Sequence, residues 1–192
     1  LGYDATYSLT EKEVIRPVPD FSIALTIVDD THLTLHEPVL IDLGAIGKGY
    51  FVDRIVEMLR QKGCERFLVN GSGDIYYEGN GVPLSCGLEH PDDTSKVIGV
   101  ATLERGALCA SAGNRRKWGT HHHTIDPHSL LSPTNILATW VIAETAALAD
   151  GLATCVFLSD PEPLRKELAF EYCILSREYR VKRSPQFHAE LF

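Results

Sequence analysis

Asp150 and Thr154 stand four residues apart in the small-residue stretch ADGLAT (residues 149–154). In a helix, this spacing places the carboxylate and the hydroxyl on the same face. The alanines beside them predict that this helix packs closely on its neighbour, and a carboxylate buried there without a partner would be costly. A hard cation would compensate the charge of Asp150 and take the hydroxyl of Thr154 as a second oxygen ligand. The pair therefore predicts a cation site.

A second candidate site lies in residues 41–54, where Lys48 is flanked by glycines at positions 44, 47 and 49. Glycine allows the backbone to pass close to a ligand. The apolar residues that follow have helical spacing, and the first turn of a helix favours anions. The glycine spacing matches neither the Walker A loop nor the Rossmann fingerprint. The segment predicts a site for a phosphate-bearing ligand, and the alternative is a glycine-rich turn that only packs the helix against a strand.

Two further loops carry polar residues among small ones. The first is Asn-Gly-Ser-Gly-Asp (residues 70–74), in which Asn-Gly is a strong hairpin signal and the polar ends could contact a ligand. The second contains Ser111 and Arg115, whose hydroxyl and guanidinium suit an anionic group or equally a solvated loop. Taken alone, residues 70–74 favour a plain turn.

Three adjacent histidines occupy positions 121–123. On a strand, His122 would face opposite to His121 and His123, and no second cluster of ligands stands out. The triplet therefore favours one functional histidine with two neighbours over a zinc site.

The elements that must position these residues follow from periodicity and turn signals. We expect an α+β fold with one domain over residues 1–192, in which a largely antiparallel sheet is packed by a few helices. Helices are predicted after the glycine-rich segment as far as Gly63, over 145–158 from a cap at Thr145, and over 160–168, with one turn after Ser8 or Thr10. Strands are predicted at 21–27, 33–41, 66–69, 75–77, 82–91, 97–103, 106–111, 139–143, 172–175 and 179–182.

Composition excludes several classes of protein. The chain has 192 residues, a net charge of −8 and no basic cluster larger than residues 115–117, which argues against a nucleic-acid partner. No apolar run is long enough to span a bilayer. The five cysteines form no Cys-x-x-Cys pair, and their odd number, together with the lack of a visible signal peptide, leans toward the cytoplasm.

Four segments taken together resemble the ApbE family of FAD:protein FMN transferases, formerly called thiamine biosynthesis lipoproteins. They are DLGAIGKGY (42–50) with Asp53, VNGSGDI (69–75), HTIDP (123–127) and ADGLAT (149–154), and residues 111–116 match more loosely. The resemblance implies a T-fold-related architecture. It also implies an enzyme that binds FAD, splits its pyrophosphate with magnesium, moves FMN onto a threonine hydroxyl of an acceptor protein, and releases AMP.

Carried over to matching positions, the resemblance implies a role for each site residue. Asp150, Thr154 and the carbonyl of Ala45 would hold magnesium, and His123 would activate the acceptor threonine, which makes His123 and Asp150 the catalytic residues. The residues implied to contact FAD are Gly47, Lys48, Gly49, Tyr50, Phe51, Asn70, Gly71, Ser72, Gly73, Asp74, Ser111 and Arg115.

Family members are usually longer, with an N-terminal region that helps to hold the adenine. We therefore expect the metal and pyrophosphate centre to be intact, and adenine binding to be weakened or supplied by sequence outside this chain. The resemblance also implies acceptors among the subunits of membrane redox complexes, and many members are exported and anchored, so the compartment stays open. Three alternatives remain at this point: a magnesium-dependent FAD pyrophosphatase that transfers FMN to water, a non-catalytic flavin-binding module, and a plain structural domain.

Overall fold

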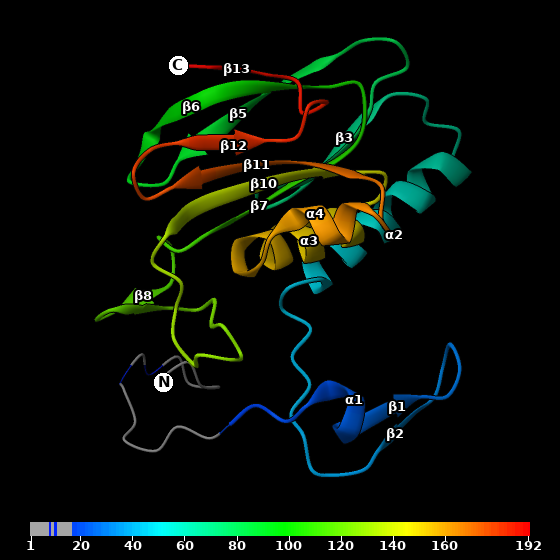
Figure 1. The fold of residues 1–192 in the computed structure, drawn as a ribbon. Coiled ribbons are helices and arrows are strands. Elements are labelled where there is room, and N and C mark those ends of the chain that lie inside the picture. The colour runs from blue at the N-terminus through cyan, green and yellow to red at the C-terminus, as the bar shows by residue number, and fades with distance from the viewer. Residues whose placement is uncertain (1–7, 9, 11–16) are drawn as a thin grey trace.

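The computed structural model describes residues 8, 10 and 17–192, and Figure 1 shows the arrangement of its elements. The helical turn predicted after Ser8 or Thr10 lies outside the described residues. In the part that the structure describes, no helix is long and apolar enough to cross a membrane. The helices are α1 Phe21–Ala24, α2 Gly47–Gln61, α3 Ala146–Leu158 and α4 Pro161–Arg165.

A six-stranded antiparallel sheet forms the centre of the molecule, with the strand order β12-β11-β10-β7-β4-β3. Helices α2 and α3 cover one face, and a three-stranded sheet of order β13-β6-β5 lies over the other (Figure 1). The predicted α+β class with a largely antiparallel sheet is confirmed. The strands of the two sheets are β3 Phe67–Gly71, β4 Asp74–Glu78, β5 Leu84–His90, β6 Asp93–Leu103, β7 Arg105–Ala112, β10 Ile136–Ala143, β11 Phe170–Ser176, β12 Val181–Arg183 and β13 Ala189–Leu191.

Alternation along β10 shows how the sheet divides the core in two. Thr139 and Val141 face α3, and the Thr139 hydroxyl donates to the Ala153 carbonyl at 2.8 Å. Ala138 and Trp140 point to the opposite face and pack with residues of the three-stranded sheet such as Leu88. Because side chains alternate across a strand, β10 contributes to both cores and is buried on both faces.

The end of α2 and the start of α3 lie where the sequence predicts, whereas α2 begins at Gly47, inside the glycine-rich segment. Gly63 follows α2 with a φ of 74°, a left-handed conformation that suits glycine behind a helix end. Thr145 precedes α3, and its hydroxyl accepts the Leu148 N–H at 3.3 Å. Both predicted caps are confirmed, and α2 buries Val52 and Val56 against the core.

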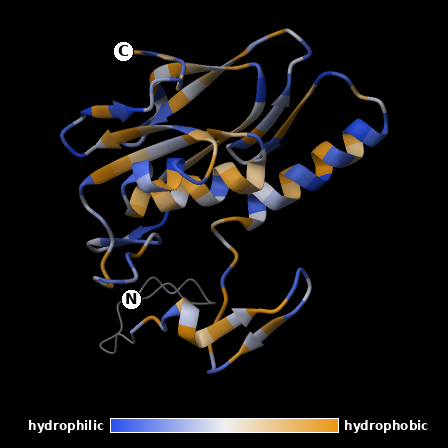
Figure 2. Cartoon of the chain, turned by 45° about the vertical axis from the view of Figure 1, so that its right-hand side comes forward, coloured by the Kyte–Doolittle hydropathy of each residue, from blue (hydrophilic) through white to orange (hydrophobic). Residues whose placement is uncertain are grey.

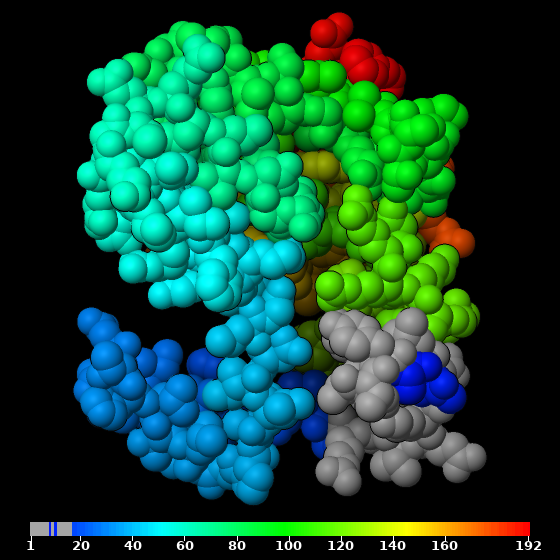
Figure 3. All heavy atoms as spheres, turned by 180° about the vertical axis from the view of Figure 1, so that it is seen from behind, coloured from blue at the N-terminus to red at the C-terminus, as the bar shows by residue number. Residues whose placement is uncertain are grey.

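The N-terminal prediction of a long hairpin is wrong in part. Residues 21–24 form α1, because the Asp20 carboxylate accepts the N–H two residues later at 2.9 Å and starts a helical turn. The hairpin itself is shorter than predicted, with β1 Leu25–Ile27 paired to β2 Leu33–Leu35. Residues 39–41 are not a strand. Together, α1, β1 and β2 lie apart from the two sheets and their covering helices, as Figures 1 and 2 show, and Figure 3 shows the same segment in blue from behind.

Three smaller predictions also need correction. The hairpin between β3 and β4 turns at Ser72 and Gly73, with φ values of 64° and 104°, whereas Asn70 and Gly71 belong to β3. Helix α4 ends at Arg165 rather than at residue 168. The short pair β8 Lys117–Trp118 and β9 His121–His122, and the strand β13, were not predicted because each pairs only two or three residues.

The crossing of α2 and α3 depends on Gly49. A Cβ at this position would lie 2.2 Å from the Ala146 carbonyl oxygen, whereas a Cβ at Gly47 would have no atom within 4 Å. We expect Gly49→Ala to lower the free energy of unfolding by about 1–3 kcal/mol, because the two helix backbones must separate. Urea denaturation of this variant beside Gly47→Ala, which should unfold near wild type, measures the difference. Equal stability of the two variants would contradict the close crossing.

Candidate functional site

Asp150 lies where the first turn of α2 meets α3. Its side chain is buried, with the residue 3% exposed, and its Oδ2 accepts the Gly49 N–H at 3.0 Å. Its Oδ1 accepts a hydrogen bond from Lys48 Nζ at 3.3 Å. The first turn of α2, which the sequence predicts to hold a ligand's anion, therefore already holds a carboxylate of the protein, and the positive end of the helix stabilises it.

Lys48 also forms an ion pair with Asp74, the first residue of β4. Asp74 is 2% exposed, so a single ammonium group bridges two buried carboxylates that come from different elements. The three side chains together carry a net charge of about −1 when both carboxylates are ionised. This excess of negative charge in a buried place favours the binding of a further cation.

Asp53 makes the reciprocal contact between the two helices. Its Oδ1 accepts the Ala146 N–H at 2.7 Å, and its Oδ2 accepts the Ala147 N–H at 2.8 Å. Each helix thus supplies a carboxylate to the first turn of the other, Asp150 to α2 and Asp53 to α3. This pairing fixes the position of Asp150. From the sequence, Asp53 was noted only as part of a motif and was given no role.

We expect Asp53→Ala to lower the free energy of unfolding by about 2 kcal/mol, because two N–H groups of the first turn of α3 lose a charged acceptor. Asp53→Asn should recover part of that loss, since the amide oxygen still accepts one hydrogen bond. Chemical denaturation followed by circular dichroism measures both variants. Wild-type stability of Asp53→Ala would show that solvent replaces this cap without cost.

Hydroxyl oxygens lie one turn along α3 from Asp150. Thr154 Oγ1 is 3.2 Å from Ser111 Oγ, which projects from β7 toward the helix. Ala45 lies in the turn just before α2, and the neighbouring Ile46 side chain would be 3.9 Å from a Cβ at Gly151. Asp150 and Thr154 thus lie one helical turn apart on α3, and the turn before α2 approaches that helix at Gly151.

These donors suit a hard cation. The set offers carboxylate, hydroxyl and carbonyl oxygens, which magnesium prefers, and no sulfur or imidazole. Among residues 8, 10 and 17–192, no three side chains of His, Cys, Asp or Glu are grouped so as to hold a metal ion. A metal at Asp150 would therefore depend on hydroxyl and carbonyl ligands, as the sequence predicts, and on the negative charge described above.

The neighbouring histidines differ in their surroundings. His122 is buried, its Nε2 donates to the Pro133 carbonyl at 2.9 Å, and its Nδ1 accepts the Thr124 N–H at 3.3 Å. Its ring also packs edge-on against Phe157 at 5.5 Å. Because both ring nitrogens form hydrogen bonds within the protein, His122 has a structural role.

His123 is half-buried. Burial, together with the positive charges of Arg116, His122 and Lys48, lowers the pKa of His123 from 6.5 to about 4. Its imidazole is therefore neutral at physiological pH and can accept a proton.

The other predicted flavin contacts fall into three groups. Tyr50 and Phe51 are exposed on α2, with their rings edge to face at 6.2 Å. Asn70 Oδ1 accepts the Gly73 N–H at 2.8 Å and closes the turn, so the amide has a structural role. Arg115 is engaged elsewhere, since its side chain is 64% exposed and its guanidinium donates to Glu89 at 2.8 Å.

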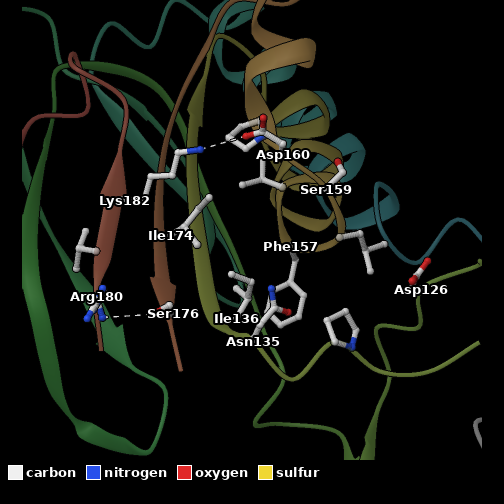
Figure 4. Close-up of a pocket in the computed structure, with 15 residues that line it drawn as sticks. Asp126, Asn135, Ile136, Phe157, Ser159, Asp160, Ile174, Ser176, Arg180 and Lys182 are labelled. Carbon is white, nitrogen blue, oxygen red and sulfur yellow. Dashed lines mark hydrogen bonds and ion pairs between the residues drawn. The ribbon is translucent and has the colours of Figure 1, made fainter. Parts of the chain in front are cut away.

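A groove of about 560 Å³ lies elsewhere, between the end of α3 and strands β11 and β12. Figure 4 shows Phe157 and Ile174 in its wall and the Lys182–Asp160 ion pair, 3.1 Å long, at its edge. Neither Asp150 nor Lys48 lines this groove. The groove is therefore separate from the candidate site.

Comparisons with known proteins identify the family of this chain. The family model described as "ApbE family" matches residues 7–172. A curated relative from Klebsiella pneumoniae (strain 342), named FAD:protein FMN transferase, is 32% identical over 133 residues, which cover 64% of this chain and 40% of the relative. A relative of the same name from Vibrio cholerae is 27% identical over 167 residues, which cover 78% of this chain and 50% of the relative.

Solved structures show the same fold. The crystal structure of the ApbE protein from Thermotoga maritima superposes with a TM-score of 0.76 at 25% identity, covering 87% of this chain and 60% of that one. The flavin transferase ApbE from Vibrio cholerae superposes with a TM-score of 0.69 at 23% identity, covering 93% and 64%. This chain spans about half the length of the curated relatives. Because the family model covers most of its residues and solved members share its fold, the chain belongs to the ApbE family.

Proposed function

We propose that this chain carries the catalytic centre of a FAD:protein FMN transferase, which moves FMN from FAD onto a threonine hydroxyl of an acceptor protein and releases AMP. The observation that carries the proposal is the buried Asp150, held by the first turn of α2 beside Lys48 and one helical turn from Thr154. The relatives named FAD:protein FMN transferase support the flavin chemistry.

Asp150, Thr154 and the carbonyl of Ala45 would hold Mg²⁺. When bound, Mg²⁺ supplies charge neutralisation at the pyrophosphate, which is the main requirement of phosphoryl transfer. Around it, the protein positions its own groups: Asp53 fixes the start of α3, and Gly49 fixes the Asp150 carboxylate through its N–H. The Lys48 ammonium adds a positive charge, and its N–H groups can donate hydrogen bonds to phosphate oxygens.

His123 is the proposed general base. Its neutral imidazole takes the proton from the acceptor threonine while the threonine oxygen forms a bond to the phosphorus of the FMN half. The bond from that phosphorus to the bridging oxygen breaks, and AMP leaves with the bridging oxygen. The lowered pKa of His123, about 4, keeps the imidazole ready to accept the proton at neutral pH.

Exposed aromatic and small residues near Lys48 could bind the flavin half of FAD. Tyr50 and Phe51 present their rings on the surface of α2, next to the Lys48 end of the helix. Ser72 and Gly73 form the exposed turn beside Asp74, at the other end of the Lys48 ion pair. We propose that FAD lies along this edge, with its pyrophosphate at Lys48 and Asp150.

Chromatographic separation of the nucleotides formed from FAD distinguishes FMN transfer to the acceptor from hydrolysis of FAD. The protein is incubated with FAD and MgCl₂, with and without a threonine-containing acceptor fragment, and AMP and FMN are quantified by chromatography. If the protein transfers FMN, AMP should form only when the acceptor is present, and the amount of free FMN should be smaller than the amount of AMP. AMP and free FMN in equal amounts without acceptor would establish a FAD pyrophosphatase instead.

A further inference from the structure

The contacts of Lys48 divide the charged centre into fixed and movable parts. The Asp74 and Asp150 side chains are 3% and 5% exposed, whereas the Lys48 side chain is 47% exposed. The Lys48 ammonium enters from the surface, and the two carboxylates lie beneath it. A long, partly solvated lysine can leave such a position by rotating about its side-chain bonds, and buried carboxylates cannot.

Neighbouring backbone contacts hold the carboxylates in place. Asp150 Oδ2 accepts the Gly49 N–H at 3.0 Å, a hydrogen bond in which the ammonium takes no part. Asp74 begins β4, opposite Gly71 in the antiparallel pairing with β3. At Gly71, a Cβ would lie 2.8 Å from a methyl group of Val52, so the hairpin packs closely on α2. The distance between the two carboxylates is therefore set by the fold and not by Lys48.

We propose that Lys48 is a resident counter-ion, which occupies the cation position between Asp74 and Asp150 and is displaced by the divalent cation, and that Asp74 is the second carboxylate of that cation's cradle. This inference rests on the proposed function for the identity of the cation as Mg²⁺. Once displaced, the ammonium lies free at the mouth of the site, where it can bind the pyrophosphate oxygens. Lys48 thus acts as a positioning residue, since it keeps the carboxylates paired when no metal is bound.

If the ammonium and the metal compete for the same position, removing Lys48 should change the metal affinity and the stability in known directions. With Lys48 present, a cation must first displace a charge-assisted hydrogen bond to each carboxylate. Without Lys48, two buried carboxylates face each other unpaired, which destabilises the metal-free fold and strengthens binding of a divalent cation. Removal of the lysine should therefore lower stability without metal and raise metal affinity.

Isothermal titration with MgCl₂ in the absence of FAD, together with thermal unfolding with and without MgCl₂, tests this inference. The variants are Lys48→Met, Lys48→Gln and the double variant Lys48→Met/Asp74→Asn. The control is Lys62→Met, at the other end of α2. We expect Lys48→Met to bind Mg²⁺ at least about tenfold more tightly than wild type and to gain a larger rise in Tm on adding Mg²⁺. The double variant should lose that gain, and Lys62→Met should match wild type.

Lys48→Gln keeps the competition test valid if Lys48→Met does not fold without metal, because the amide can still donate to the carboxylates while lacking the charge. Unchanged or weaker Mg²⁺ binding in both single variants would overturn the inference. Equal tightening in Lys48→Met and the double variant would remove Asp74 from the cradle. Because no FAD or acceptor is used, these results are independent of the transferase assay, and wild-type transfer alongside unchanged metal binding would leave the proposed function intact.

Discussion

Asp150→Asn is expected to lower the rate of FMN transfer by about three orders of magnitude while leaving the protein folded. The amide oxygen can still accept the Gly49 N–H, so the crossing of α2 and α3 keeps its hydrogen bond. The negative charge that would hold the cation is lost, and removal of one preorganised electrostatic group commonly costs about two to three orders of magnitude in rate. Single-turnover transfer with saturating FAD, compared with wild type, gives the ratio.

A matched control for this variant is Asp160→Asn. Asp160 is the exposed residue before α4 and pairs with Lys182 at 3.1 Å, away from the site. It should transfer FMN at the wild-type rate. Circular dichroism should show the same helix content for both variants, and titration with MgCl₂ should show weakened binding for Asp150→Asn alone. Wild-type transfer by Asp150→Asn would remove the metal assignment from this residue.

His123→Ala is expected to reduce transfer by about two to four orders of magnitude, because the acceptor hydroxyl loses its general base. FAD binding should be unchanged, since the imidazole is assigned to the acceptor and not to the nucleotide. Transfer kinetics and equilibrium binding of FAD measure the two effects separately. His128→Ala, at an exposed position in the same loop, should behave as wild type. Loss of FAD binding in His123→Ala would make this residue a ligand contact.

The low pKa of His123 also predicts the pH dependence of both rate and stability. Because His123 stays neutral down to about pH 4, its protonation should not slow wild-type transfer between pH 8 and pH 5. The unfolded chain, with an ordinary histidine pKa, binds the proton first. Stability contributed by neutral His123 is therefore complete above pH 6.5 and declines as the pH falls from 6.5 toward 4. Urea denaturation of wild type and His123→Ala across this range should show a shallower decline in the variant.

Sequence patterns predict the elements whose signals are local. The cap at Thr145, the helix end at Gly63 and the strands at 106–111 and 139–143 each depend on neighbours within a few residues, and the structure has all of them. The hairpin at residues 70–74 shows the limit of such signals. Asn-Gly and Ser-Gly both suit a turn, and the pairing of β3 with β4 places the turn at Ser72 and Gly73.

The start of the N-terminal hairpin was predicted wrongly for a related reason, although its two strands do pair. Phe21, Ile23 and Leu25 alternate as in a strand, but Asp20 caps a helical turn over the same residues. With only three paired residues in β1, the alternation has little strand pairing to support it. A short segment with two competing local signals is decided by such details and not by periodicity.

The sequence predicts which residues belong to the candidate site but not the contacts between them. Asp150 and Thr154 follow from helical spacing, yet the partners of Asp150 lie 101 and 102 residues away, at Gly49 and Lys48. Gly49 illustrates the difference, because the sequence suggests a close ligand whereas the structure shows the Ala146 carbonyl in that place. Long-range contacts of this kind depend on how α2 and α3 cross, which no local pattern encodes.

The most direct test of the transferase assignment is the intact mass of an acceptor fragment incubated with the protein, FAD and MgCl₂, read together with the AMP released. We expect the acceptor to gain one FMN unit, AMP to appear in equal amount, and a chelator to abolish both. Replacing the target threonine of the acceptor with alanine should abolish both as well. An acceptor of unchanged mass, in an assay where a full-length relative labels the same fragment, would contradict the claim that the Asp150 centre of this chain transfers FMN.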